Sequence, residues 1–177
     1  MFVDLRGSTR IAERGLPYDT VFLVNRFLGA VSQAVIDAGG QPNQFLGDGL
    51  LALFGLDTTE EAACRQALDA VGRIKANVAK LNEDYADELA EPIRYGVGVN
   101  GGTAIIGNIG HPDRTVFTAL GDSVNVAARL QDMTKSLQCE TLVSEDVCVA
   151  AGLAADASAV RTVDIRGREE TLRARAI

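Results

Sequence analysis

The sequence predicts an α+β fold, with a ferredoxin-like βαββαβ core and an extended, mainly antiparallel sheet covered by helices. Long stretches carry apolar residues at intervals of three and four, the spacing of an amphipathic helix. Short apolar runs bounded by glycine lie between them and predict strands. No linker, repeat or low-complexity stretch interrupts residues 1–177, so we expect a single domain.

The first part of the chain predicts a strand end and two helices. Residues 1–4 have the pattern of the end of a buried strand, so we expect a fragment of a longer protein with its first strand truncated. Gly7, Ser8 and Thr9 supply a turn and hydroxyl N-caps for a short helix. Apolar periodicity then predicts a long helix over Tyr18–Ala38.

The middle of the chain predicts a hairpin and a second long helix. Two apolar runs within Gln41–Phe54 are split by Gly47–Gly49, which indicates two strands joined by a tight turn with Asp48 at its tip. Thr58 and Glu61 fit a capping box. The helix that they begin has one apolar face, formed by Cys64, Leu68, Val71, Ile74, Val78, Leu81 and Tyr85.

The remaining chain predicts strands around one more long helix. Arg94–Asn100, rich in glycine and β-branched residues, begins another strand pair. A third long helix is expected over about Asp122–Thr134. Short strands then alternate with a helix near Ser144 and end in Val160–Ile177.

Charge and cysteine usage exclude several classes of protein. The net charge of −7 argues against a nucleic-acid-binding surface but not against a nucleotide substrate, because a bound metal can supply positive charge locally. Cys64, Cys139 and Cys148 lack zinc-site spacing and are odd in number, so we expect structural thiols in a reducing cytosol. No apolar run approaches the ~18 residues that would cross a membrane.

Two aspartates are candidates for a metal site because each follows an apolar run. Asp4 ends the first strand and Asp48 lies in the hairpin turn. In a βαββ unit these strands are neighbours, so the two carboxylates can meet, and a divalent cation between them would remove their repulsion. Two Mg²⁺ ions on such carboxylates are a common apparatus for phosphoryl or nucleotidyl transfer. Aspartate is also common in turns; the pairing favours the metal site.

Other polar residues are candidates for handling a phosphate. The backbone N–H groups of Gly7–Thr9 lie at a helix start. Asn125 and Arg129 share a helix face and could stabilise charge on a phosphate, although a solvated face explains them equally well. We reject a dinucleotide-binding role for the glycines of 96–102, which lack the following helix. His111 is interpreted as a loop residue rather than a catalytic base.

Four sequence blocks occur in order along the chain: Phe2–Thr9, Phe45–Phe54, Gly107–Gly110 and Leu120–Leu130. Together they resemble the catalytic domain of class III adenylate and guanylate cyclases. The resemblance covers nearly the whole chain, and its last block is highly specific. The segment 164–170 is also similar to the closing hairpin of that family.

The resemblance implies metal and phosphate ligands. Asp4 and Asp48 match the two aspartates that hold a pair of Mg²⁺ or Mn²⁺ ions, with the Leu5 carbonyl as an additional ligand. The triphosphate-binding loop of the family corresponds to Gly7, Ser8 and Thr9. Basic positions that contact phosphate fall near Arg114, Arg166 and Arg168.

The family also implies a dimer. Asn125 matches the asparagine that orients the ribose, and Arg129 matches the arginine that stabilises the transition state at the α-phosphate. In this family the metal aspartates come from one chain and these two residues from the other, so the expected partner is a second copy packed head to tail. The 3′ oxygen attacks the α-phosphorus and pyrophosphate leaves.

The choice of purine depends on Gln44 and Thr118. Adenylate-specific members usually have Lys at the first position and Asp, Thr or Ser at the second, whereas guanylate cyclases usually have Glu and Cys. Thr118 favours ATP, while the amide of Gln44 could pair with either purine. Guanylate cyclase, or a nucleotide-binding regulatory module with little turnover, are the alternatives. A diguanylate cyclase is excluded because its Gly-Gly-Asp/Glu-Glu-Phe turn is absent. We expect a cytosolic domain, regulated by an upstream sensor, membrane segment or linker helix.

Overall fold

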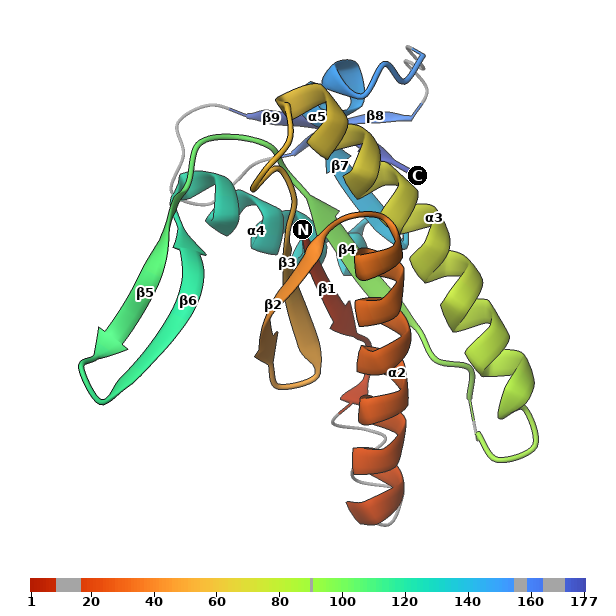
Figure 1. The fold of residues 1–177 in the computed structure, drawn as a ribbon. Helices are drawn as coiled ribbons and strands as arrows, with labels where there is room; N and C mark the ends of the chain where they lie inside the picture. Colours follow the sequence, from red (N-terminus) through yellow and green to blue (C-terminus); the bar gives the residue numbers. More distant parts are fainter. Residues whose placement is uncertain (9–16, 90, 155–158, 164–170) are drawn as a thin grey trace.

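The computed structural model describes residues 1–8, 17–89, 91–154, 159–163 and 171–177 (Figure 1). The elements in chain order are β1 (Phe2–Leu5), α2 (Pro17–Asp37), β2 (Gln41–Leu46), β3 (Gly49–Leu53), α3 (Glu60–Asp84), β4 (Tyr95–Val99), β5 (Ile105–His111), β6 (Arg114–Leu120), α4 (Asp122–Ser136), β7 (Thr141–Ser144), α5 (Glu145–Ala150), β8 (Val160–Val163) and β9 (Leu172–Ala176).

Seven strands form one sheet in the order β2-β3-β1-β4-β7-β9-β8, and β5 pairs with β6 in a separate hairpin (Figure 1). Among the described strands, β4 and β7 are the parallel pair and the other pairings are antiparallel. The predicted α+β class and the mainly antiparallel sheet are therefore confirmed. The short helix expected after Gly7 lies outside the described residues.

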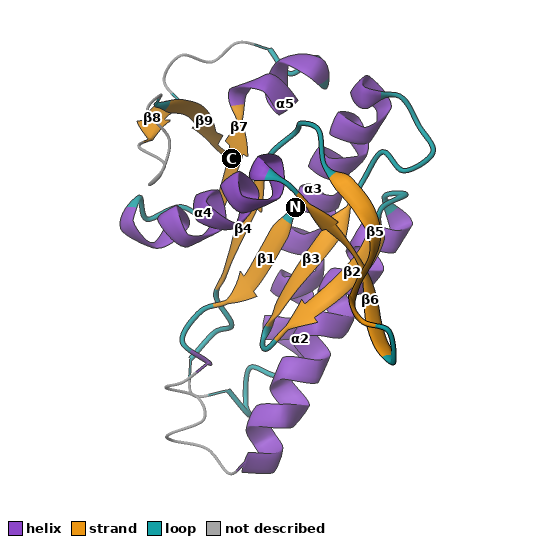
Figure 2. Cartoon of the chain, turned by 90° about the vertical axis from the view of Figure 1, so that its left-hand side faces the viewer, coloured by secondary structure: helices purple, strands orange, loops and turns teal. Residues whose placement is uncertain are grey.

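The sheet separates two layers of helices (Figure 2). On one face, α2 and α3 pack over Val3 and Leu5 of β1 and over Val97 of β4, all of them buried in the main apolar core. Side chains alternate along a strand, so Phe2 and Asp4 point to the opposite face, which α4 covers. That second face carries Asp4.

Two glycines of β4 allow α4 to lie directly on the sheet. A side chain at Gly98 would come within 2.1 Å of the Ala127 carbonyl oxygen, and one at Gly96 within 2.5 Å of the Thr134 hydroxyl. Because Gly96 is paired with Asp4 in the neighbouring strand, the same arrangement brings the last turns of α4 beside Asp4. The glycines that did not fit a dinucleotide fingerprint therefore serve helix packing.

Two local predictions are wrong. The N-cap of α3 is Thr59, whose hydroxyl accepts a hydrogen bond from the Ala62 N–H at 3.3 Å, rather than Thr58. The two threonines are adjacent and equally suited to capping, so the sequence alone did not show which of them begins α3. The strand at Arg94–Asn100 was expected to pair with the next strand, but β4 pairs with β1 and β7 while β5 leaves the sheet.

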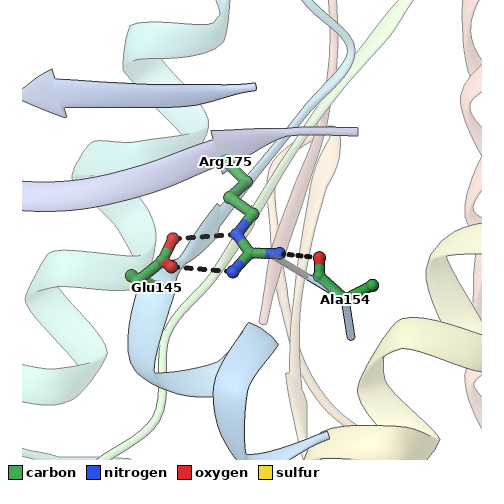
Figure 3. Close-up of polar contacts among 3 residues, drawn as sticks. All are labelled: Glu145, Ala154 and Arg175. Carbon is green, nitrogen blue, oxygen red and sulfur yellow. Dashed lines mark hydrogen bonds and ion pairs between the residues drawn. The ribbon is translucent and has the colours of Figure 1, made fainter. Parts of the chain in front are cut away.

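A buried ion pair fixes the last strand to α5 (Figure 3). Arg175 in β9 is 2% exposed and donates two hydrogen bonds to the Glu145 carboxylate, at 2.7 and 2.8 Å. A third donor on the same guanidinium reaches the Ala154 carbonyl at 2.7 Å. The bidentate geometry compensates for the removal of both charges from water, and it lowers the pKa of Glu145.

The three thiols have the structural setting that their spacing suggested. Cys64 and Cys148 are buried, Cys139 is half-buried, and all three are free. Burial raises the pKa of each thiol, which keeps it protonated and unreactive. Within the described part of the chain, no helix has the length and apolar character needed to span a membrane.

Candidate active site

The structure brings Asp4 and the turn that carries Asp48 together. Asp4 in β1 is paired with Gly49 in β3, the residue directly after Asp48. Gly49 is buried, and a Cβ on it would lie 2.8 Å from Asp4 Oδ1 and 3.0 Å from the Val3 carbonyl oxygen. The Asp4 carboxylate therefore lies over Gly49, at a point where only a glycine leaves room for it.

The Asp4 carboxylate is partly buried and lies close to a second negative charge. Burial and then the negative charge of Asp48 raise the pKa of Asp4 to about 6. On α4, Lys135 opposes this rise in the pKa and Asp132 adds to it. Two carboxylates under mutual repulsion, with oxygen donors, suit a hard divalent cation. The described residues contain no cluster of three His, Cys, Asp or Glu side chains around it, so backbone oxygens, water or a ligand would complete the coordination.

The chain turns at Arg6 and Gly7, directly after β1. Leu5 buries its side chain in the core, and its carbonyl is on the exit from β1. Gly7 has a φ of +75°, a left-handed conformation that favours glycine, and it is exposed. Ser8 is half-buried, and Thr9, Arg166 and Arg168 lie outside the described residues.

Gln44 and Thr118 contact each other, although 74 positions separate them in the chain. The hydroxyl of Thr118 in β6 donates a hydrogen bond to Gln44 Oε1 in β2 at 3.3 Å. The neighbouring amide of Asn43 donates to the Phe117 carbonyl at 3.0 Å. These two bonds join the base of the β5–β6 hairpin to the edge of the main sheet, so the two purine candidates form one pair.

Asn125 and Arg129 lie in the first two turns of α4. The helix begins at Gly121, whose φ of 156° no side chain readily adopts, and Gly121 also packs against the Thr103 carbonyl. Asn125 is exposed and Arg129 is half-buried, while their neighbours Val126, Ala127 and Leu130 are buried.

Within one chain, Asn125 is remote from the carboxylates along α4, whereas Arg129 lies about one turn before Asp132. The helix residues whose charges reach Asp4 are Asp132 and Lys135. With a rise of about 1.5 Å per residue, Asn125 lies roughly 15 Å along the axis from Lys135. Asp132 and Lys135 were missed in the sequence, because nothing in their spacing shows which strand α4 crosses.

Arg114 and His111 lie at the far end of the β5–β6 hairpin, paired with each other across its turn. The His111 side chain is exposed, with Nδ1 3.5 Å from a carboxylate oxygen of Asp113. Arg114 is also exposed. No contact in the described chain joins either residue to Asp4 or Asp48.

An apolar surface is exposed on the β5–β6 hairpin and the adjoining edge strand β2, and we call it the apolar arm. Figure 1 shows the hairpin projecting from the body of the domain. Ile105 is 76% exposed and Phe45 is 60% exposed. The apolar arm comprises Phe45, Leu46, Ile105, Ile106, Ile109, Val116, Phe117 and Leu120, all of them exposed. Strand alternation divides the residues of the hairpin between its two faces, and this amount of exposed apolar surface is typical of an interaction site.

Comparison with known proteins identifies the family to which this fold and this pair of carboxylates belong. A family model described as the adenylate and guanylate cyclase catalytic domain matches residues 1–173. The chain belongs to this family, the class III nucleotide cyclases, which are phosphorus–oxygen lyases.

Individual relatives and structures agree with this assignment. An adenylate cyclase from Anabaena cylindrica is 31% identical over 151 residues, which are 83% of this chain and 29% of that protein. An uncharacterized protein of Mycobacterium tuberculosis is 35% identical over 179 aligned residues, covering 98% of this chain and 31% of its own length. The chain thus spans about 30% of the length of these relatives.

Among solved structures, the guanylyl cyclase Cya2 aligns with a TM-score of 0.88 and 26% identity, covering 99% of this chain and 88% of its own. The adenylyl cyclase CyaB from P. aeruginosa aligns with a TM-score of 0.85 and 21% identity, covering 99% and 91%. The neighbours include both specificities, so the family leaves the purine undecided.

Proposed function

We propose that this domain converts ATP to 3′,5′-cyclic AMP and pyrophosphate at a site shared by two copies of the chain packed head to tail. The observation that carries the proposal is the pairing of Asp4 with Gly49, which sets two mutually repelling carboxylates at one point of a cyclase fold. In the reaction, the ribose 3′ oxygen bonds to the α-phosphorus, the bond from that phosphorus to pyrophosphate breaks, and the hydroxyl proton passes to solvent.

Asp4, Asp48 and the Leu5 carbonyl would hold two Mg²⁺ or Mn²⁺ ions. The donors are all oxygen, as these cations prefer, and the raised pKa of Asp4 reflects its burial and then the negative charge of Asp48, both of which a cation would offset. When bound, the ions lower the pKa of the ribose hydroxyl and balance charge on the leaving group. The N–H groups of Gly7, Ser8 and Thr9 would bind triphosphate oxygens, and Arg114 would add a cation near them.

Asn125 and Arg129 would act from the second copy. The Asn125 amide orients the ribose, and the permanently charged Arg129 donates hydrogen bonds to the α-phosphate oxygens as charge develops there. Two features support a shared site: the position of Asn125 in the first turn of α4, away from Asp4, and the exposed apolar arm. Burial of the apolar arm against a second copy would supply the hydrophobic free energy of association.

The bond between Thr118 and Gln44 supports ATP as the substrate. Because Thr118 donates to Gln44 Oε1, the Gln44 Nε2 is left as a donor and the Thr118 oxygen as an acceptor. Adenine presents the complementary pair, an acceptor at N1 and a donor at its 6-amino group. Guanine also presents an acceptor, O6, and a donor, N1–H, but it has a further donor, its 2-amino group, for which this pair leaves no acceptor.

Product measurements test the reaction. The purified protein is incubated with Mn²⁺ and either ATP or GTP, and the cyclic product is measured over a range of protein concentrations. We expect cyclic AMP, formed at a rate that rises faster than linearly with protein as dimers assemble. Cyclic GMP as the sole product would assign the guanylate alternative, and tight nucleotide binding with no product would assign the regulatory module.

Mixing two inactive variants tests the shared site. Asp48→Ala and Arg129→Ala should each lose activity, because either substitution breaks both sites of a homodimer. Their mixture should recover up to about a quarter of wild-type activity, since half of the dimers then mix the two chains and each has one intact site. A mixture as inactive as its components would exclude the head-to-tail site.

We further propose that the domain is a cytosolic part of a longer protein regulated by segments upstream, because the curated relatives are about three times as long. Fractionation of cells that produce the natural protein, followed by cyclase assays with and without those segments, tests this. Equal activity of both forms under all conditions would argue against upstream regulation.

A further inference from the structure

Arg6 links the exit of β1 to the end of α4. Its backbone N–H donates to the Arg94 carbonyl at 2.8 Å and so extends the β1–β4 pairing by one residue. Its guanidinium Nη2 donates to the Cys139 carbonyl at 2.5 Å, across 133 positions of sequence. Strand alternation places this side chain on the same face as Asp4, the face that α4 covers.

The acceptor of this bond belongs to the end of α4. The helix ends at Leu137, and Gln138 turns the chain with a φ of 51°. The Cys139 N–H then bonds back to the Thr134 carbonyl at 3.1 Å. Cys139 is therefore fixed to α4 through its N–H and to Arg6 through its oxygen. A cation at this end of a helix is also favoured by the helix dipole.

The described neighbours of Arg6 are protein groups. Its Nε is buried and has no hydrogen-bond partner among the described residues. Next to it, Tyr95 is 4% exposed, and its hydroxyl donates a hydrogen bond to the Glu140 carboxylate at 3.4 Å. Burial raises the pKa of this phenol, and the positive charge of Arg6 opposes that rise. Arg6 thus lies among protein groups, one residue beyond the Leu5 carbonyl and one before Gly7.

We propose that Arg6 is a positioning residue for the metal-binding half of the active site. This proposal rests on the proposed function. By joining the exit of β1 to the last turn of α4, Arg6 holds Asp4, the Leu5 carbonyl and the Gly7 turn in a fixed relation to the helix. A neutral side chain of similar length leaves this exit attached by backbone bonds alone, so the metal ligands must be ordered when the cation binds.

Substitution of Arg6 tests the proposal, with Arg94→Met as the matched control. Arg94 is an exposed arginine whose described contact is through its backbone carbonyl, so its variant removes the same side chain from the residue directly before β4. Mn²⁺ binding to the nucleotide-free protein is measured by calorimetry, at a temperature well below the melting temperature of every variant. For Arg6→Met we expect affinity to fall roughly tenfold, Arg6→Lys to recover part of it, and Arg94→Met to match wild type.

Hydrogen exchange separates this proposal from the proposed function. In Arg6→Met, the amides of Arg6, Gly7 and Cys139 should exchange about tenfold faster than in wild type, whether or not the protein has cyclase activity. A wild-type protein that binds no Mn²⁺ would overturn both the proposed function and the role of Arg6. Unchanged Mn²⁺ affinity in a folded Arg6→Met protein, next to an active wild type, would overturn the role of Arg6 alone. A lower melting temperature with unchanged affinity would likewise overturn that role, since Arg6 would then stabilise the fold without positioning the metal ligands.

Discussion

Thr118 and Gln44, on strands of different sheets, form a hydrogen-bonded pair 3.3 Å apart, with the threonine hydroxyl as the donor. The bond fixes which end of the Gln44 amide is free. In the proposed site this pair presents one donor and one acceptor to the base, so a change of either member should alter the substrate preference.

Gln44→Glu should therefore shift the substrate preference towards GTP. A carboxylate offers acceptors only, which suit the N1–H and 2-amino donors of guanine and leave adenine N1 facing an acceptor. We expect the ratio of kcat/KM for ATP over GTP to fall by about 10- to 100-fold, as for loss of one or two hydrogen bonds in a buried site. Gln33→Glu, an exposed change of the same chemistry on α2, is the control. An unchanged ratio would remove Gln44 from the purine site.

Gly49→Ala should displace Asp4. Its added Cβ would meet Asp4 Oδ1 at 2.8 Å and the Val3 carbonyl at 3.0 Å, and the carboxylate is the group that can move. We expect Mn²⁺ affinity to fall by about tenfold or more, with a stability loss of about 1 kcal/mol. Gly29→Ala in α2 is the control, since nothing lies within 4 Å of its added Cβ. Wild-type Mn²⁺ affinity in Gly49→Ala would contradict the placement of Asp4.

Asp4→Asn should stabilise the metal-free protein while abolishing turnover. The folded-state pKa of Asp4 is about 6, above its ordinary value of 3.8, so the folded state binds this proton more tightly than the unfolded chain. Stability from this group is complete below the ordinary value, declines as the pH rises towards 6, and stays low above it. Because Asp4 is half-exposed, the decrease in the free energy of unfolding over this pH range is on the order of 1 kcal/mol.

Melting curves in chelator at pH 5 and pH 8 check this. Asp4→Asn should melt higher than wild type at pH 8, with a smaller difference at pH 5, and added Mn²⁺ should raise the melting temperature of wild type only. If Asp4→Asn is less stable than wild type at pH 8, burial of the Asp4 charge and its repulsion by Asp48 do not dominate in the metal-free site.

The sequence allowed the elements to be predicted, because local periodicity determines them. The helix over Tyr18–Ala38 and the hairpin with Asp48 at its tip were found from apolar spacing and glycine placement, and the structure confirms both. Local spacing does not determine which strands pair with each other. The departure of β5 from the sheet depends on contacts made far along the chain, and spacing carries no record of them.

The candidate site could likewise be predicted only in part. Two aspartates after apolar runs indicated neighbouring strands, and the Asp4–Gly49 pairing agrees. Gln44 and Thr118 were singled out by family resemblance, since no local pattern joins residues 74 positions apart. Arg175 shows the limit most clearly: an arginine in an alternating terminal strand suggests a solvated side chain, yet Glu145 and Ala154 hold it in the interior.

Gly98→Ala should destabilise the domain severely, because α4 packs directly on the sheet at that glycine. The added Cβ would lie 2.1 Å from the Ala127 carbonyl oxygen and 2.3 Å from the Gln131 nitrogen, both of them backbone atoms of α4. The helix must then lift away, which opens the packing of Val126 and Leu130 against the sheet. We expect a loss of about 3 kcal/mol or more in the free energy of unfolding.

The matched control for this change is Gly72→Ala in α3. Nothing lies within 4 Å of a Cβ at Gly72, which is exposed in a helix interior, so alanine should stabilise the protein by about 0.5–1 kcal/mol. Urea unfolding at one fixed protein concentration measures both variants, because association contributes to the stability of a dimer. The two glycine-to-alanine changes should thus have opposite signs. If the Gly98→Ala protein is as stable as wild type, α4 does not pack directly on β4. The placement of Lys135 and Asp132 beside Asp4 would then also be wrong.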